Sequence, residues 1–212
     1  MALIEVQLPN SLARALRLPK KSPRRQQLKV LKKLLKKARF TEFGQQFHFD
    51  RILLGKRIVR NFQENVPIYD YSKIYKEWWY KTLEGRPDIC WPGIIKYYAL
   101  SSGTSEAASK YIPITNDLLR GNRIVMVRQL LSLRNYQDIP VRSIGKGWLM
   151  IGGSTDLQKG AGYYSGDLSG ITAKKVPFWF SPFYKPGRRI AKTKDWTQKL
   201  EEIVEQAPNW DI

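Results

Sequence analysis

Short strand patterns that alternate with helical ones constrain the fold of this chain more than any other feature. The run IIKYYAL at residues 94–100 is β-branched, aromatic and short, which predicts a buried strand. KYIPIT at 110–115 predicts a second extended segment, and Pro113 favours the edge of a sheet because proline cannot donate a ladder hydrogen bond. GWLMIGG at 147–153 predicts a further strand. We expect the strands near 95–100 and 147–153 to lie in one sheet.

Helical patterns stand on either side of these strands. Four segments carry apolar residues at helical spacing or follow a capping side chain: 24–40, 71–83 after Asp70, 116–133 after Thr115 or Asn116, and WTQKLEEIVEQA after Asp195. The proline-punctuated stretch 171–189 predicts irregular structure. The alternation of helices and strands indicates an α/β protein.

The charge of the chain is strongly positive and unevenly distributed. There are 37 Lys and Arg against 18 Asp and Glu, a formal net charge of +19, and residues 1–60 hold 16 basic and 3 acidic residues, so 16 − 3 = 13 of these charges. This balance attracts polyanions: nucleic acid, an acidic membrane surface, or small phosphates and carboxylates. In 24–40, lysines flank a stripe of Leu28, Leu31, Leu35 and Ala38. We favour a solvated basic face on a packed helix, with a nucleic-acid or membrane role as the alternative.

The single histidine and the single cysteine narrow the possible chemistry. With only His48 and Cys90 available, a zinc site of the His/Cys type and a Ser-His-Asp or Cys-His mechanism are implausible, and no metal ligand is assigned. We expect His48 to be a packed aromatic ring among its phenylalanine neighbours, and Cys90 to be a small buried hydrophobe. The cluster Trp78, Trp79 and Tyr80 is expected to belong to the core.

Several absences point to a soluble cytoplasmic protein. One cysteine excludes an intrachain disulfide, and the first residues lack the long apolar run of a signal peptide. No stretch reaches the roughly 18 apolar residues that a membrane span needs. We therefore predict a cytoplasmic protein with no membrane partner.

The small-residue segment SSGTSEAAS at 101–109 separates the two strand patterns. Small residues leave backbone N–H groups open to a ligand, serine and threonine add hydroxyls, and Lys110 adds an ammonium group, so the segment can cradle an anion. We expect it to be a solvent-facing loop at a strand end. A turn without function is the alternative for such a loop taken alone, and a plain turn is the alternative for Gly152 and Gly153.

A family resemblance favours the anion-binding interpretation of this loop over a turn without function. SSGTSEAASKYIPIT resembles the phosphate-binding motif of the adenylate-forming enzymes, although many members have Gly at the position of Ala107 and Pro or Arg at that of Ser109. Three further segments, together with it, resemble in order and spacing the plant auxin-responsive acyl-acid amido synthetases and their bacterial relatives: FTEFGQQFHFDRIL, FQENVPIYDYSKI and EGRPDICWPG. The resemblance covers residues 25–206.

The resemblance implies a fold and a domain organisation. It implies the N-terminal part of the large adenylate-forming domain, with an incomplete sheet flanked by helices. We expect a basic N-terminal extension at 1–23 and this domain portion at 24–212. The family's later motifs for adenine, ribose and the acyl pocket find no match before Ile212, so we expect a partner in the C-terminal part of the same protein. An isolated chain should then expose an apolar face and be inactive alone.

The resemblance also implies an activity. A carboxylic acid attacks the α-phosphate of Mg²⁺-ATP to give an acyl-adenylate and pyrophosphate, and an amine or amino acid then displaces AMP. No catalytic residue is assigned. The resemblance implies that six residues bind the ATP phosphates: Ser101, Ser102, Gly103, Thr104, Ser105 and Lys110. Two alternatives stay open, a basic nucleic-acid-binding module and a non-catalytic remnant of the family. We do not expect nucleic acid as a partner, because nucleic-acid binding explains the charge but not the SSGT loop.

Overall fold

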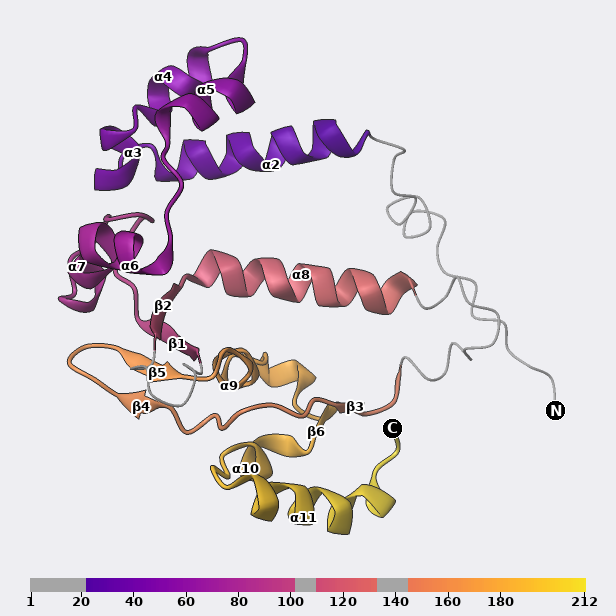
Figure 1. Cartoon of the computed structure of the whole chain (residues 1–212). Coiled ribbons are helices and arrows are strands. Elements are labelled where there is room, and N and C mark those ends of the chain that lie inside the picture. The colour runs from indigo at the N-terminus through magenta and orange to yellow at the C-terminus, as the bar shows by residue number, and fades with distance from the viewer. Residues whose placement is uncertain (1–21, 102–109, 133–144) are drawn as a thin grey trace. The chain divides into compact units, whose positions relative to one another are not determined.

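The chain forms two compact units, residues 1–68 and residues 69–212. The structure is a computed structural model, and it describes residues 22–101, 110–132 and 145–212 (Figure 1). Each unit is considered by itself below.

The first unit consists of helices around a small apolar core. Its described elements are α2 (Pro23–Ala38), α3 (Glu42–Gln46), α4 (Phe49–Leu54) and α5 (Ile58–Asn65). The predicted stripe of α2 packs on the other three helices, with Leu35 and Ala38 buried, while its lysines are exposed. Phenylalanine rings fill the space between the short helices, as Phe43 lies 4.7 Å from Phe47 and 5.9 Å from Phe49 between ring centroids.

A buried threonine fixes the turn between α2 and α3. Thr41 Oγ1 donates to the carbonyl oxygen of Ala38 at 2.7 Å and accepts from the backbone N–H of Gly44 at 3.1 Å. A Cβ atom at Gly44 would overlap the Ala38 carbonyl oxygen. The two helices can therefore meet this closely only with glycine at position 44.

The second unit begins with the helix predicted at 71–83. It comprises α6 (Tyr71–Ile74), a π-helical turn (Tyr75–Trp79) and α7 (Tyr80–Leu83). Asp70 caps it as predicted, because its Oδ1 accepts from the backbone N–H of Lys73 at 2.7 Å. The widened turn was not expected from the sequence.

A four-stranded sheet carries the predicted pair of strands. Its order is β2 (Lys110–Ile114), β1 (Tyr97–Ser101), β5 (Tyr164–Gly166) and β4 (Gln158–Lys159). β2 is antiparallel to β1, and β5 is parallel to β1. Pro113 lies in β2, at the edge of the sheet, which confirms the placement predicted for this proline.

The prediction that 95–100 and 147–153 share one sheet is wrong. Only β3 (Trp148–Leu149) forms in the latter segment, and it pairs in parallel with β6 (Tyr184–Lys185) in a separate two-stranded sheet. The strand beside β1 is instead β5. An apolar run indicates a strand but does not specify which strand it pairs with, and the glycines at its end pack elsewhere.

Helices complete the second unit, which is of the expected mixed α/β class. They are α8 (Asn116–Ser132), α9 (Leu168–Lys174), α10 (Gly187–Ala191) and α11 (Trp196–Gln206), with 3₁₀ turns at Phe178–Phe180 and Ala207–Asn209. α9, β6 and α10 correct the prediction that 171–189 is irregular. Asp195 caps α11 as predicted, but only half of the capping box forms, since the side chain of Gln198 donates to Glu202.

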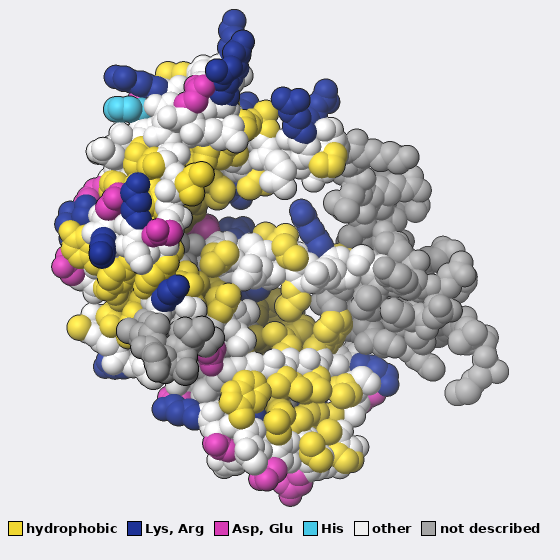
Figure 2. All heavy atoms as spheres, viewed as in Figure 1, with side chains coloured by type: hydrophobic (Ala, Val, Ile, Leu, Met, Phe, Trp, Pro, Cys, Tyr) yellow, Lys and Arg dark blue, Asp and Glu magenta, His cyan; other side chains and the backbone are white. Residues whose placement is uncertain are grey.

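Two helices of the second unit expose apolar side chains. On α8, Leu119 is buried in the core with Ala99, Ile114, Leu157 and Ile171, whereas Leu118, Ile124, Val125 and Val127 are exposed. On α11, Trp196, Leu200 and Val204 form an exposed stripe at a spacing of four residues. Figure 2 shows hydrophobic side chains, in yellow, gathered on the surface over α10 and α11. Within the described ranges, no helix is long and apolar enough to cross a membrane.

Candidate functional site

The antiparallel register of β1 and β2 brings together the two ends of the predicted phosphate-binding segment. Ser101, the last residue of β1, lies directly opposite Lys110, the first residue of β2. Ser101 is half-buried and Lys110 is exposed. The other four predicted site residues, Ser102, Gly103, Thr104 and Ser105, lie outside the described residues. The described part of the candidate site is therefore one hydroxyl and one ammonium group at the same end of the sheet.

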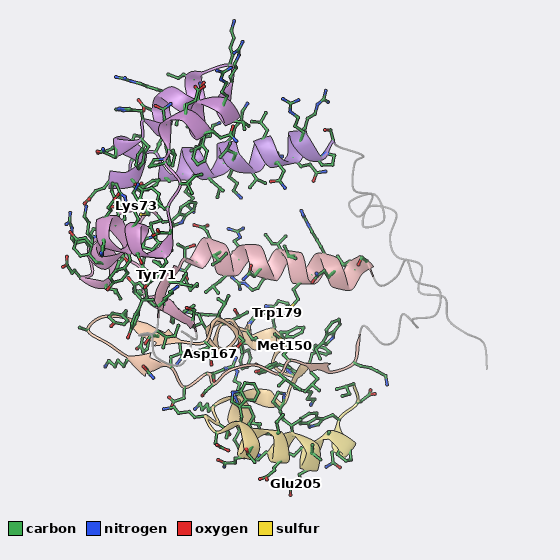
Figure 3. The ribbon with its side chains drawn as sticks, in the orientation of Figure 1. Tyr71, Lys73, Met150, Asp167, Trp179 and Glu205 are labelled. Atoms are coloured by element: carbon green, nitrogen blue, oxygen red, sulfur yellow. The ribbon has the colours of Figure 1, made fainter. Side chains whose placement is uncertain are left out.

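A tyrosine from α6 contacts the first two residues of β2. The Lys110 Nζ atom lies 5.2 Å from the centroid of the Tyr71 ring. The backbone N–H of Tyr111 donates to Tyr71 Oη at 2.9 Å. Figure 3 shows Tyr71 on the side of α6 that faces β2. Tyr71 thus holds both the side chain of Lys110 and the backbone of the next residue.

A buried tyrosine in the middle of β1 joins the sheet to α7. Tyr98 Oη donates to Thr82 Oγ1 at 2.9 Å, and Thr82 Oγ1 donates to the carbonyl oxygen of Trp79 at 2.6 Å. Burial raises the pKa of Tyr98 to about 12, against the hydrogen bond to Thr82, which lowers the pKa. The rings of Tyr98 and Tyr163 meet edge to face with 5.1 Å between centroids. These contacts hold β1 against the helix that carries Tyr71.

The glycine pair at 152 and 153 is explained by close packing. The backbone N–H of Gly153 donates to Ser169 Oγ at 2.8 Å, and a Cβ atom at Gly153 would overlap the side chain of Asp167. Lys199 Nζ donates to the carbonyl oxygen of Gly152 at 3.1 Å, and only 2% of this lysine is exposed. Burial lowers the pKa of Lys199, and the Asp167 carboxylate partly offsets this shift in pKa. This corner is a polar packing site between α9 and α11.

Three expectations about individual side chains need correction. His48 is exposed rather than packed, and it lies in the turn between two helices, where its backbone has a left-handed conformation with a φ of 50°. Cys90 is half-buried rather than buried. Of the expected aromatic cluster Trp78 is buried, Trp79 is half-buried and Tyr80 is exposed, so only Trp78 fully belongs to the core.

Sequence reasoning missed the two side chains that hold the site and the glycine corner. Tyr71 directly follows a recognised cap, but its contact partner lies 40 residues further along the chain. Lys199 shares a face of α11 with the buried Ile203 four residues later, which was the available signal for its burial. Among the residues that the structure describes, no group of three His, Cys, Asp or Glu side chains could hold a metal ion.

Comparison with known proteins gives matches over nearly the whole chain. The family model described as GH3 family N-terminal domain matches residues 13–203. A solved structure of GH3.15 acyl acid amido synthetase is 25% identical, with a TM-score of 0.67, and the match covers 92% of this chain and 33% of that chain. A structure of AtGH3.15 acyl acid amido synthetase in complex with 2,4-DB is 20% identical, with a TM-score of 0.61, over 96% of this chain and 41% of that chain, and is similar in fold.

The matches cover most of this chain but less than half of each matched structure. This chain spans between about a third and two fifths of the length of these two structures. No protein with a curated description matches the chain.

Proposed function

The chain belongs to the GH3 family, and from this membership we propose that it provides the ATP phosphate-binding part of an acyl acid amido synthetase. In the proposed reaction, a carboxylate oxygen of the acid attacks the α-phosphorus of ATP and pyrophosphate leaves. An amine or amino acid nitrogen then attacks the acyl carbon, and AMP leaves as the amide forms. The acid is already ionised at neutral pH, so this chemistry needs no histidine base.

The observation that carries the proposal is the pairing of Ser101 with Lys110 at one end of the sheet, in a chain of this family. Negative charge builds on the phosphate oxygens as pyrophosphate leaves. Fixed donors aimed at such oxygens each contribute on the order of 3 kcal/mol, or a factor of 10²–10³ in rate. We assign the donors to Ser101, Ser102, Thr104 and Ser105, the close backbone approach to Gly103, and the cation to Lys110.

The donor set fits a polyphosphate better than a metal ion. It comprises hydroxyls, backbone N–H groups and an ammonium group, all of which donate hydrogen bonds to anionic oxygens. In this proposal Mg²⁺ reaches the site on the phosphates of ATP, where it neutralises part of their charge.

We also propose that residues 24–212 form the N-terminal portion of the adenylate-forming domain, preceded by a basic extension at 1–23. Two observations support the view that further polypeptide completes the active site. The chain spans about a third to two fifths of the structures that it matches. The apolar side chains of α8 and α11 are exposed, whereas helices with apolar residues on several sides are usually covered. We expect the 212 residues alone to self-associate and to show no turnover.

The test is the acid-dependent exchange of labelled pyrophosphate into ATP, measured on a longer protein that contains this chain. Ser102→Ala and Thr104→Ala should each lower the exchange rate by roughly 10- to 100-fold while the fold stays intact. Gly103→Val should do more damage, because a branched side chain blocks backbone approach to the phosphates. Lys110→Met should lower the exchange rate clearly and should change the free energy of unfolding by a smaller amount when both effects are expressed as free energies.

The control is His48→Gln, which changes an exposed side chain of the first unit and should leave exchange unchanged. Unchanged exchange in all of the loop variants would contradict the phosphate-binding assignment. Loss of exchange in the control would indicate a different site.

A second candidate function is nucleic-acid binding, and the exposed lysines of α2 favour it. If lysine and arginine contacts to phosphate dominate, the logarithm of the binding constant falls by about 0.9 per contact for each tenfold rise in salt. Filter binding of duplex DNA to the chain at two salt concentrations distinguishes the two functions. Tight, steeply salt-dependent binding would favour the nucleic-acid role.

A further inference from the structure

The side chain of Tyr71 links α6 to the start of β2, where it contacts two consecutive residues. Its ring lies under the Lys110 ammonium group, with 5.2 Å from Nζ to the ring centroid, and its hydroxyl accepts from the backbone N–H of Tyr111 at 2.9 Å. We propose that Tyr71 is a positioning residue that holds the Lys110 ammonium group ready for the phosphates of ATP, an inference that rests on the proposed function.

The hydroxyl contact fixes the backbone from which Lys110 extends. β2 is at the edge of the four-stranded sheet, so one side of this strand has no neighbouring strand to accept its N–H groups. Tyr71 Oη accepts the N–H of Tyr111, and Tyr111 lies opposite Leu100 of β1. The start of β2 is thereby held from both sides, by β1 and by α6.

The ring contact restricts the ammonium group itself. A lysine side chain loses considerable rotamer freedom when it binds a ligand, and a contact that limits this freedom beforehand lowers the cost of binding. The face of an aromatic ring attracts a cation. Lys110 remains exposed, and in the described part of the chain no carboxylate pairs with it, so its charge is available to an incoming anion.

The Tyr71 ring is in turn held by its own helix. It stacks on Tyr75 with 5.7 Å between centroids and meets the edge of Trp79 at 6.1 Å. Tyr71 is also the first residue of α6, directly after the Asp70 cap. The position of the Lys110 ammonium group therefore depends on a helix that starts 39 residues earlier in the chain, and not only on the strand that carries it.

The experiment measures binding of inorganic tripolyphosphate, the phosphate part of ATP without adenosine, to the 212-residue chain. Calorimetry at about 0.3 M salt reduces non-specific attraction to the basic surface. Tyr71→Leu removes both contacts and should weaken binding by roughly three- to tenfold, the range for a cation held on a ring together with its lost preorganisation. Tyr71→Phe keeps the ring and loses only the hydroxyl, so its affinity should lie between those of Tyr71→Leu and the unchanged chain.

Two controls separate positioning from a general effect. Tyr164→Leu removes a similar pair, because Lys174 Nζ lies 5.6 Å from the Tyr164 ring, at the opposite end of β1 from Ser101. Lys33→Met removes one exposed lysine of α2. Both variants should bind tripolyphosphate as the unchanged chain does. In a Lys110→Met background, Tyr71→Leu should cause no further loss of affinity. If the role of Tyr71 were purely structural, Tyr71→Leu would weaken binding in this background as well.

A second readout does not depend on any ligand. The ring current of Tyr71 should shift the NMR signals of the Lys110 ε-methylene protons upfield, and this shift should persist in Tyr71→Phe and vanish in Tyr71→Leu. Its absence from the unchanged chain would overturn the positioning role even if Tyr71→Leu does not fold.

The outcomes distinguish this inference from the proposed function. If Lys110→Met weakens binding but Tyr71→Leu does not, the positioning role is wrong and the phosphate site stands. If Lys110→Met has no more effect than Lys33→Met, the phosphate site itself is wrong, and the positioning role is lost with it.

Discussion

The two units of the chain use aromatic side chains in different ways. All seven tryptophans and all eleven tyrosines lie in residues 69–212, and residues 1–68 contain phenylalanine as their only aromatic type apart from His48. Phenylalanine has no polar group, and its rings fill space around α4. Tyrosine and tryptophan add a polar tip, and in the second unit these tips bind backbone and side-chain groups, as in Tyr71 to Tyr111 and Trp78 to Tyr69.

The two units also treat their cations differently. Residues 1–68 hold 16 basic and 4 acidic residues, which leaves 37 − 16 = 21 basic and 18 − 4 = 14 acidic residues for 69–212. Yet among the described residues, one cation lies over an aromatic ring in the first unit, Arg39 over Phe40, against six lysines in the second: Lys73, Lys81, Lys110, Lys174, Lys175 and Lys199. A binding site needs cations in fixed positions, so the second unit is the better place for one, although the first unit has the higher charge density.

The largest expected effects come from one glycine in each unit. A Cβ atom at Gly44 would overlap the Ala38 carbonyl oxygen, and one at Gly170 would overlap the Ser154 carbonyl oxygen. Because both obstacles are backbone atoms, Gly44→Val and Gly170→Val should each lower the free energy of unfolding by about 3 kcal/mol or more. Urea unfolding followed by tryptophan fluorescence reports on the second unit alone, and circular dichroism reports on both. Gly44→Val should lose helix signal while its tryptophan transition stays in place.

The control for these variants is Gly121→Ala in α8, where an added Cβ atom meets nothing within 4 Å. It should be neutral or raise the free energy of unfolding by about 0.5 to 1 kcal/mol, since alanine favours a helix more than glycine does. If Gly44→Val moves the tryptophan transition as far as Gly170→Val does, the two units do not unfold separately.

Local features of the fold could be predicted from the sequence, and long-range pairing could not. The stripe of α2 and the caps Asp70, Thr115 and Asp195 act within a few residues, so their signals are contained in the sequence window that forms them. The partner of β1 is not determined locally. The sequence predicted 147–153 beside β1, but the strand that pairs with β1 is 164–166, for which no strand was predicted, and Gly152 and Gly153 pack against Ser169 and Asp167.

The same distinction holds for the candidate site. The small-residue segment, its flanking strands and Lys110 were recognisable from composition and order. The contact of Tyr71 with β2 was not, because tyrosine in a helix reads equally well as core, and only the folded chain brings residue 71 beside residue 111. Whether Ser102 to Ser105 surround a phosphate stays a prediction, since these residues lie outside the described ranges.

Alkaline pH should destabilise the second unit selectively, because every tyrosine lies there. Burial raises the pKa of Tyr98 from 10.0 to about 12. Between these values the unfolded chain loses this proton and the folded chain keeps it, so the free energy of unfolding falls as pH rises. Tyr98 alone should account for up to about 3 kcal/mol of this loss, since each pKa unit corresponds to about 1.4 kcal/mol.

The measurement is the unfolding free energy of the second unit, followed by tryptophan fluorescence from pH 9 to 12. Tyr98→Phe should be less stable near pH 9, where it lacks the bond to Thr82, and should lose less stability on going to pH 12. Tyr80→Phe, at an exposed position, serves as control and should keep the slope of the unchanged chain. An identical slope in Tyr98→Phe would show that other groups cause the alkaline loss.

Smaller effects are expected from a helix cap in each unit. Thr41 is buried and satisfies both Ala38 O and Gly44 N, whereas Asp70 is exposed and caps with one oxygen. Thr41→Ala leaves the N–H of Gly44 without its acceptor, while the Ala38 carbonyl oxygen keeps only the bond from the backbone N–H of residue 41. It should lower the free energy of unfolding by about 2 kcal/mol, against about 1 kcal/mol for Asp70→Ala. Circular dichroism should detect the first change and tryptophan fluorescence the second. Thr41→Ser and Asp70→Asn should recover most of each loss, and failure of Thr41→Ser to do so would indicate that the methyl group matters instead.

The smallest difference concerns one ion pair in each unit. Arg60 and Glu64 are neighbours on one turn of α5, with 2.6 Å between Nε and Oε1, and 66% and 54% of their side chains are exposed. Arg189 of α10 and Glu202 of α11 join two helices at 2.7 Å, and only 18% of the Glu202 side chain is exposed. Water and salt screen the first pair well, so Arg60→Gln should cause no measurable change in stability. Arg189→Gln should lower the free energy of unfolding by about 1 kcal/mol, because it leaves a largely buried carboxylate without its cation.

Since Gln198 also donates to Glu202, a Glu202→Gln variant and the double variant are needed to isolate the coupling of the pair. Equal coupling in the two units, both abolished by about 1 M salt, would mean that burial of Glu202 contributes nothing and that the surface charges of the two units behave alike.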